Sequence, residues 1–281
     1  MKAEILRIAA FCDATRGGNP AGVMLADAHP DENDMRRIAA ELGYSETAFA
    51  MPFGESWRVR YFSPESEVPF CGHATIALGA ALALEYGDDV YSLRLNDAEI
   101  TVEGRRENGI LTAALQSPPT HSAALPGELL DETLALFGYR HADLDAALPP
   151  ARVHGGADHF ALALNSRERL AAMAYDLDAG RELMRREGII TILLAWAESP
   201  RFFHTRNPFA SGGVYEDPAT GAATAAFAGY LRDLGWPHAG SIEILQGEDM
   251  GSPSRLQAEI SSTPGASIRV SGRARLIEEG I

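Results

Sequence analysis

The stretch Glu67-Val-Pro-Phe-Cys-Gly-His-Ala-Thr75 organises the chain, because it is nearly repeated at Glu216-Asp-Pro-Ala-Thr-Gly-Ala-Ala-Thr224. Aligned without gaps, the two motifs share Glu, Pro, Gly, Ala and Thr. Each is followed by an alanine-rich run that closes at a glycine, Gly87 or Gly235. The pattern predicts a turn that delivers a glycine to a helix N-terminus, where unpaired N–H groups and the helix dipole favour a small anion. The alternative is that two helix starts resemble each other by chance. A true internal repeat would extend beyond the motifs, along the rest of the chain.

The elements expected around the two motifs follow the same order in each half. Strands are expected at 4–12, 21–25, 47–51, 57–62, 91–95, 100–103, 109–115, 189–196, 201–204, 241–245, 256–260 and 267–270, and helices at 30–42, 75–86, 127–137, 166–173, 178–187 and 220–234. The run 153–164 is expected to be a Gly155-Gly156 turn that leads into a further strand. The repeated order indicates an internal duplication into two α+β halves, each a strand-rich sheet around a central helix and related by a pseudo-two-fold. The ligand site is expected between the halves, with one motif from each.

A linker is expected at Gln116-Ser-Pro-Pro-Thr120. It predicts an N-terminal half at 1–117 and a C-terminal half at 118–281, with the last strand a candidate to return to the N-terminal half. The chain has 281 residues and 46% hydrophobic residues, which is enough to bury a sizeable core. Its net charge of -15 disfavours nucleic acid and anionic membranes as partners, because both attract basic patches. No run is apolar enough to span a bilayer and no signal-peptide pattern is present, so a cytoplasmic location is expected.

The composition also bears on cofactors. Cys12 and Cys71 are the only cysteines, too few for a disulfide framework or a structural zinc site, so no metal is expected. Lys2 is the only lysine, and a pyridoxal-phosphate enzyme needs an internal lysine for its Schiff base. The sequence therefore predicts that pyridoxal phosphate is not the cofactor.

Several short motifs together resemble one family. They are Gly18-Asn19-Pro20, Ser45-Glu46-Thr47-Ala48-Phe49, the first motif, Asp217-Pro-Ala-Thr-Gly221 and Gln246-Gly247, in this order. The combination, which covers essentially the whole chain, resembles the PhzF-like phenazine-biosynthesis isomerases of the wider diaminopimelate epimerase fold. The resemblance implies a cofactor-free isomerase with two similar domains, each a curved, mostly antiparallel sheet around a central helix, and a site in the cleft between them. It further implies a small anionic substrate and an assembly that is either a monomer or a homodimer.

The resemblance also assigns roles to residues. Glu46 is the implied general acid/base, His73 and Asp217 are implied polar partners, and Gly72 and Gly221 lie at the helix ends that hold substrate. Two other residues depart from the family pattern, and the role of a third is less specific. Ala222 stands where members commonly carry Ser, Ser252 stands where they usually carry Arg, and Asn19 either offers an amide to the cleft or serves the turn. The departures keep open a second hypothesis, a catalytically idle small-molecule binding protein of the same fold.

The residues themselves leave alternatives. Glu46 lies between an expected helix end at Gly43 and an apolar strand, where a partly desolvated carboxyl would have a raised pKa; without the family pattern it would read as a surface glutamate. His73 in a first helical turn is expected to be neutral, and either relays a proton or is satisfied by backbone groups. Asp217 either caps the second helix or orients His73 or a substrate amine. Arg60 either meets a substrate carboxylate or is solvent-exposed.

Cys71 separates two mechanisms. Racemases of the wider fold use two thiols, one from each half, as acid/base groups. The position equivalent to Cys71 in the second motif is Thr220, and Cys12 lies in the first expected strand. A two-thiol epimerase is therefore disfavoured, and Cys71 is expected to be a small buried packing residue.

Overall fold

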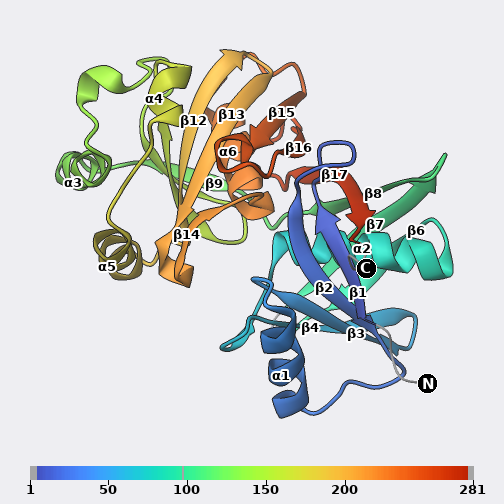
Figure 1. The fold of residues 1–281 in the computed structure, drawn as a ribbon. Helices are drawn as coiled ribbons and strands as arrows, with labels where there is room; N and C mark the ends of the chain where they lie inside the picture. The colour runs from blue at the N-terminus through green and yellow to red at the C-terminus, as the bar shows by residue number, and fades with distance from the viewer. Residues whose placement is uncertain (1–4, 97, 278–281) are drawn as a thin grey trace. The chain divides into compact units, whose positions relative to one another are not determined.

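The computed structural model describes residues 5–96 and 98–277, which form two compact units. One unit contains the described residues up to Gln116 together with the segment from Ser271 onward, and the other is Ser117–Val270. The last strand thus belongs mainly to the first unit. In Figure 1 the strands of each unit are gathered around one helix, α2 in the first and α6 in the second. Lys2 lies outside the described residues. No helix in the described ranges combines the length and the apolar character needed to cross a bilayer.

The strands of the first unit pair in an order that closes on itself. They are β1 (Ile5–Ala10), β2 (Asn19–Leu25), β3 (Thr47–Phe53), β4 (Ser56–Phe62), β5 (Glu67–Val68), β6 (Asp89–Arg94), β7 (Glu99–Glu107), β8 (Ile110–Gln116) and β17 (Arg269–Leu276). The order of neighbours is β17, β1, β2, β3, β4, β6, β7 and β8, and β8 pairs with β17 again. The β2–β3 and β4–β6 pairs are parallel, whereas β1–β2, β3–β4, β6–β7 and β7–β8 are antiparallel.

Helix α2 (Gly72–Tyr86) is enclosed by this sheet. Every residue from His73 to Ala83 is buried, so the helix has no solvent face, as expected for one that is apolar all round. Its small residues allow close approach of the strands. At Gly104 of β7 an added Cβ would lie 2.1 Å from the carbonyl oxygen of Gly79, so this contact needs a glycine. On the outside, α1 (Glu32–Leu42) covers β3 and β4 with Met35.

The second unit repeats the pairing scheme. Its elements are β9 (His121–Ala124), α3 (Gly127–Phe137), β10 (Ala151–His154), β11 (Asp158–Ala163), α4 (Arg167–Ala171), α5 (Leu177–Glu187), β12 (Thr191–Ser199), β13 (Phe202–Phe209), β14 (Val214–Asp217), α6 (Gly221–Leu234), β15 (Ser241–Gln246) and β16 (Ser254–Glu259). The neighbours run β9, β10, β11, β12, β13, β15 and β16, with β11–β12 and β13–β15 parallel. Strands β10 to β16 thus follow the same parallel and antiparallel order as β1 to β7, so the predicted duplication and α+β class are confirmed.

The structure differs from the expected elements at short segments. Helix α2 begins at Gly72 rather than Thr75, because the motif glycine is itself the first helical residue. The predicted turn at Gly155-Gly156 does lead into a strand, β11, but the short strand β10 that pairs with it was not predicted. Strands β5 and β14 were not predicted, since β5 has only two residues and shows no periodicity.

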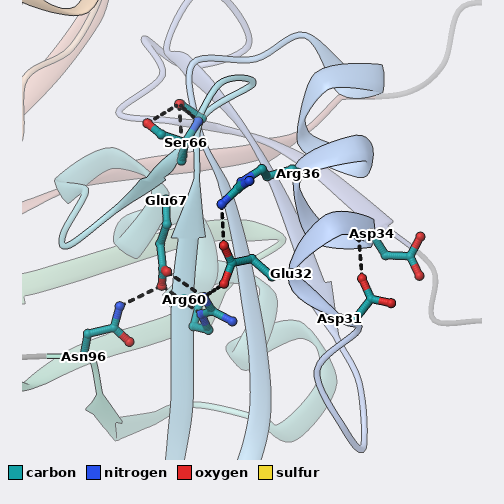
Figure 2. A network of polar contacts seen from close by, with 9 residues as sticks. Asp31, Glu32, Asp34, Arg36, Arg60, Ser66, Glu67 and Asn96 are labelled. Carbon is teal, nitrogen blue, oxygen red and sulfur yellow. Dashed lines mark hydrogen bonds and ion pairs between the residues drawn. The ribbon is translucent and has the colours of Figure 1, made fainter.

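The glutamate shared by the two motifs holds an arginine in each unit. Arg60 of β4 donates from Nε to Oε1 of Glu67 over 2.8 Å and from Nη2 to Oε2 over 2.6 Å. Figure 2 shows this pair with Asn96, whose amide donates to the same carboxylate, and with Glu32, which also accepts from Arg60. Arg60 is therefore neither solvent-exposed nor free for a substrate. The bidentate pair ties the start of the motif to β4.

In the second unit the same pair is more deeply buried. Arg206 of β13 donates from Nε to Oε1 of Glu216 over 3.0 Å and from Nη2 to Oε2. The two side chains are 9% and 3% exposed, against 21% for both Arg60 and Glu67. The shared glutamate thus has the same partner in both units but a different solvent environment.

This difference predicts unequal costs for equivalent substitutions. Glu216→Gln leaves the buried Arg206 charge uncompensated and should lower the free energy of unfolding by about 3 kcal/mol. Glu67→Gln, in the more solvated pair, should cost about 1 kcal/mol. Urea unfolding followed by circular dichroism would measure both. Equal costs, or a larger cost for Glu67→Gln, would contradict the assignment.

The second unit also contains a buried histidine. His159 of β11 is fully buried, and its Nδ1 lies 2.7 Å from Oγ1 of Thr191, whose hydroxyl donates to Oδ1 of Asn207 over 3.2 Å. Because that hydroxyl proton points to Asn207, Nδ1–H donates to Thr191 and Nε2 carries a lone pair that has no partner among the described residues. Burial lowers the pKa of His159 to about 3.

The low pKa makes stability depend on pH. The imidazole of the unfolded chain titrates near ~6.5, so below that pH the unfolded state binds one more proton than the folded state. The free energy of unfolding should therefore fall on acidification, with a contribution from His159 of about 1.4 kcal/mol per pH unit between pH 6 and 4. In His159→Asn, which cannot titrate, this contribution should vanish. Chemical unfolding at a series of pH values would show it, and identical slopes in both proteins would refute it.

Candidate active site

The predicted acid/base residue lies where helix α1 passes into β3. Gly43 ends α1 in the left-handed conformation, and Ser45 and Glu46 follow just before the strand. Strand β3 is parallel to β2, which fixes the direction in which the chain enters the sheet. The Glu46 residue is 9% exposed. The structure thus places a carboxyl group inside the first unit rather than on its surface.

Helix α2 brings His73 to this carboxyl. His73 is the second residue of the helix, and its Nε2 lies 3.4 Å from Oε2 of Glu46 and 3.3 Å from Oγ of Ser45. Its Nδ1 lies 3.3 Å from Sγ of Cys71. Ser45, Glu46, Cys71 and His73, here called the Glu46 cluster, therefore form one largely buried polar group within the first unit.

Cys71 is more than the packing residue that was expected. It contacts the apolar core around α2, yet its sulfur lies within 4.0 Å of both ring nitrogens of His73. Its carbonyl oxygen accepts from Oγ1 of Thr75 over 2.7 Å, and the hydroxyl of Tyr61 lies 2.7 Å from the same Oγ1. The threonine of the first motif thus fixes the carbonyl at the start of α2. Burial raises the pKa of Tyr61, which keeps this phenol neutral.

The second motif forms a separate hydrogen-bonded turn. Thr220 donates from Oγ1 to Oδ2 of Asp217 over 2.6 Å. The amide of Gln246 accepts from the backbone of Thr220 over 3.1 Å and donates to the carbonyl of Asp217 over 2.7 Å. The following Gly247 has φ +72, and a Cβ there would lie 2.3 Å from the carbonyl oxygen of Ser252. Gln246-Gly247 therefore supports the motif turn, a role that the sequence did not reveal.

The two central helices begin in the same way. Their N-cap residues are Cys71 and Thr220, and neither makes a side-chain capping hydrogen bond. Asp217 is therefore not the N-cap of α6, contrary to one of its two expected roles. The N–H groups of the first turns, starting at Gly72 and Gly221, are not satisfied by an N-cap side chain, which suits an anion.

The strand register gives the counterpart of Glu46 in the second unit. Phe49 of β3 pairs with Arg60, and Leu194 of β12 pairs with Arg206. Each of these arginines holds its motif glutamate, so the residues three positions before Phe49 and Leu194 correspond. They are Glu46, just before β3, and Thr191, the first residue of β12. In the alignment of the two motifs, Thr220 corresponds to Cys71 and Ala222 corresponds to His73. The titratable groups of the Glu46 cluster thus have uncharged counterparts.

The structure gives the positions of the remaining predicted site residues but does not test their roles. Asn19 is buried at the start of β2, where it pairs with Ala10. Ala222 follows Gly221 in the first turn of α6. Glu46 and His73 are brought together in the first unit, and Asp217, Gly221 and Ala222 belong to the second. The part that these three and Asn19 take in binding stays a prediction.

Two groups of side chains bring possible metal-ligand atoms close together, and the first unit also has a cavity. Ligand atoms of Glu46, Cys71 and His73 all lie within 4.8 Å of one another, as do those of a surface group of His121, His154 and Asp158. A cavity of about 880 Å³ in the first unit is lined near the C-terminal part of α2 by Leu84 and by three arginines, Arg106, Arg273 and Arg275. No residue of the Glu46 cluster lines it.

Comparison with known proteins agrees with this architecture. The family model described as phenazine biosynthesis-like protein matches residues 8–280. An uncharacterized isomerase of Pseudomonas aeruginosa is 32% identical over 284 residues, covering 98% of this chain and 100% of the relative. The trans-2,3-dihydro-3-hydroxyanthranilate isomerase of the same organism is 30% identical over 282 residues, covering 97% and 96%.

Solved structures show the same fold. A phenazine biosynthesis protein of the PhzF family from Bacillus anthracis has a TM-score of 0.87 at 21% identity, covering 99% of this chain and 98% of that one. A probable proline racemase from Agrobacterium radiobacter has a TM-score of 0.65 at 12% identity, covering 99% and 92%. With the family model matching nearly its full length and its relatives named isomerases, the chain belongs to the phenazine biosynthesis-like protein family and is an isomerase.

Proposed function

We propose that the chain is a cofactor-independent isomerase or epimerase in which Glu46 moves a proton on a small carboxylate-bearing substrate. The observation that carries the proposal is the 3.4 Å approach of Glu46 Oε2 to His73 Nε2 inside the first unit. A carboxylate in such a place can take a proton from a bound substrate and return it. Its burial limits exchange of that proton with bulk water.

The neighbouring side chains suit this role. His73 Nε2 and Ser45 Oγ both lie close to the carboxyl, so they can orient it and hydrogen-bond to its charged form. In the proposed reaction Glu46 takes a proton from a carbon made acidic by a neighbouring carboxylate or enamine. The electron pair is then delocalised into the substrate, and the protonated Glu46 delivers the proton to another carbon on the same face.

Backbone groups would stabilise the charge that builds up. The N–H groups at the start of α2, from Gly72 onward, point along the helix axis and carry its positive dipole end. A substrate carboxylate bound there would lie near the Glu46 cluster, because His73 belongs to the same helical turn. The proposal gives Gly221, Ala222, Asp217 and Asn19 supporting roles in holding the rest of the substrate.

The difference between the two units favours a single base. A racemase with one acid/base group in each half needs a titratable side chain at both equivalent positions. Here Thr191, Thr220 and Ala222 occupy the positions that match Glu46, Cys71 and His73, and none of these three ionises near neutral pH. A proton shift on one face of the substrate fits this arrangement better than a two-thiol mechanism.

The relatives suggest the substrate class. Two that match most of the chain are named trans-2,3-dihydro-3-hydroxyanthranilate isomerase, at 30% and 32% identity. We therefore propose that the substrate is a small acid that is cyclic or resembles an amino acid.

The role of Glu46 can be tested by hydrogen exchange. Candidate acids are incubated with the protein in deuterated water, and C–H exchange and isomer formation are followed by NMR. Glu46→Gln should lower the rate by at least ~100-fold, the usual contribution of a general acid/base. Glu55→Gln, on an exposed turn of the same unit, is the control and should match the wild type. Unchanged turnover in Glu46→Gln rules out the proposal, and ligand binding without any turnover would favour an idle binding protein.

A second substitution separates one-base from two-thiol chemistry. Cys71→Ser should lose less than about tenfold in kcat, because the sulfur borders His73 without transferring the proton. Removing an acid/base group instead costs ~10²–10⁴-fold. Steady-state rates for Cys71→Ser and Glu46→Gln on the same substrate would measure the difference. An equally inactive Cys71→Ser would point to the thiol as the acid/base group.

A further inference from the structure

The cavity near the C-terminal end of α2 has a charge opposite to that of the chain as a whole. The chain carries 39 acidic and 24 basic residues, yet among the described residues Arg106, Arg273 and Arg275 line this cavity and no aspartate or glutamate does. We propose that the cavity binds a small organic acid with an apolar body, at a place separate from the Glu46 cluster. This inference does not rest on the proposed function.

The three arginines are not neutralised by acidic neighbours. Arg275 donates from Nη2 to the carbonyl oxygen of Gly17 over 3.3 Å, and within the described part of the chain this is the only hydrogen bond that the three side chains make. None of them forms an ion pair with a described carboxylate. The guanidinium groups therefore lack a counter-charge, which an acidic ligand would supply through charge-assisted hydrogen bonds.

Capping of α2 does not explain the arginines. Basic side chains often hydrogen-bond to the last carbonyl groups of a helix, where the negative end of the dipole lies. Here the carbonyl oxygens of Leu82 and Gly87 accept from the hydroxyl of Tyr91 instead. The hydrogen bond of Arg275 goes to a loop carbonyl and not to the helix.

Two of the arginines act on the same region of the cavity wall. Arg273 and Arg275 are two positions apart on β17, so their side chains leave the same face of the strand. Burial raises the pKa of the Cys12 thiol, and the positive charges of Arg275 and Arg273 both oppose that rise. Both charges therefore lie near Cys12, and an acid group beside them would meet their combined field.

The cavity also has an apolar wall. Leu84 of α2 and Leu111 of β8 line it, and both belong to the core around α2. Ile110 and Leu276 line it as well and are 43% and 44% exposed. Covering such side chains with an apolar group removes them from water, which favours binding. The volume of about 880 Å³ lies within the range of ~300–1,000 Å³ that is typical of small-molecule sites.

The cavity lies at the other end of α2 from the Glu46 cluster. Leu84 follows His73 by eleven residues in this helix, which is roughly 16 Å along its axis. A small acid bound beside Leu84 would therefore not occupy the helix start at Gly72, where the proposed substrate carboxylate lies.

The test uses anilinonaphthalene sulfonate, a fluorescent probe that carries one acid group on an apolar body. Its emission rises in an apolar site, and titration of the full chain should saturate at one probe per chain. Octanoate should displace the probe. Octanol has the same carbon chain without the charge, and inorganic phosphate has charge without the carbon chain, so each should displace the probe at least ~tenfold less effectively.

Two consecutive arginines of β7 give a matched pair of variants. Arg106→Gln and Arg105→Gln remove the same charge from adjacent positions, but only Arg106 lines the cavity. Arg106→Gln and Arg275→Gln should each raise the dissociation constant of the probe at least ~threefold, as expected for a partly exposed charge pair. Arg105→Gln should leave it unchanged. Ile110→Ser, which removes part of the apolar wall, should also weaken binding.

Several outcomes would overturn the site. They are absence of probe binding to the wild type, equal binding to all three arginine variants when circular dichroism shows them folded, and displacement by octanol or phosphate as strong as that by octanoate. Binding that changes in Glu46→Gln but in neither Arg106→Gln nor Arg275→Gln would assign the probe to the Glu46 cluster and also overturn it. The fluorescence readout needs no turnover, so a failure of the proposed isomerase function would leave this result standing, and a failure of probe binding would leave the exchange test of Glu46 untouched.

Discussion

The enclosure of α2 by its own sheet is the constraint on which the site depends. The helix has no polar face from His73 to Ala83, so it is stable only when strands surround it. Once enclosed, it cannot rotate without breaking contacts such as that between Gly79 and Gly104. The direction of His73 at its first turn is therefore set by packing along the whole helix. The buried core, rather than a flexible loop, holds the imidazole beside Glu46.

Much of this arrangement can be predicted from local sequence patterns. The motif glycines, the alanine-rich runs and the turn at Gly43 each carry their own signal, so the central helices and the duplication are predictable. The Arg60–Glu67 pair and its counterpart at Arg206 are not, because both depend on strand pairing between residues seven to ten positions apart. The same holds for the contact of Cys71 with His73. Residues two apart on a regular helix do not face each other, and here the N-cap conformation of Cys71 permits the contact.

Pairing also reveals the match between Glu46 and Thr191, which the sequence hides. The residues around them share little, and Thr47 next to Glu46 suggests a different alignment with Thr191. The Arg–Glu pairs decide the alignment, because positions in both units can be counted from the strand partners of the equivalent arginines. Seen this way, the second unit keeps a polar group at the equivalent position, where Thr191 bonds to His159 and Asn207. That group is neutral, since burial holds the pKa of His159 at about 3.

The duplicated frame and the one-sided chemistry have separate physical origins. What both units retain is what the frame needs: the enclosed helix, the glycine at its start, the threonine of its first turn and the Arg–Glu pair before it. Among the differences are the side chains at the helix start, where Thr220 and Ala222 align with Cys71 and His73. The second unit lacks these ionisable groups, yet its strands pair in the same parallel and antiparallel order. A duplicated scaffold can therefore carry an ionisable cluster in one half alone, and this is the half to which the proposed proton transfer by Glu46 belongs.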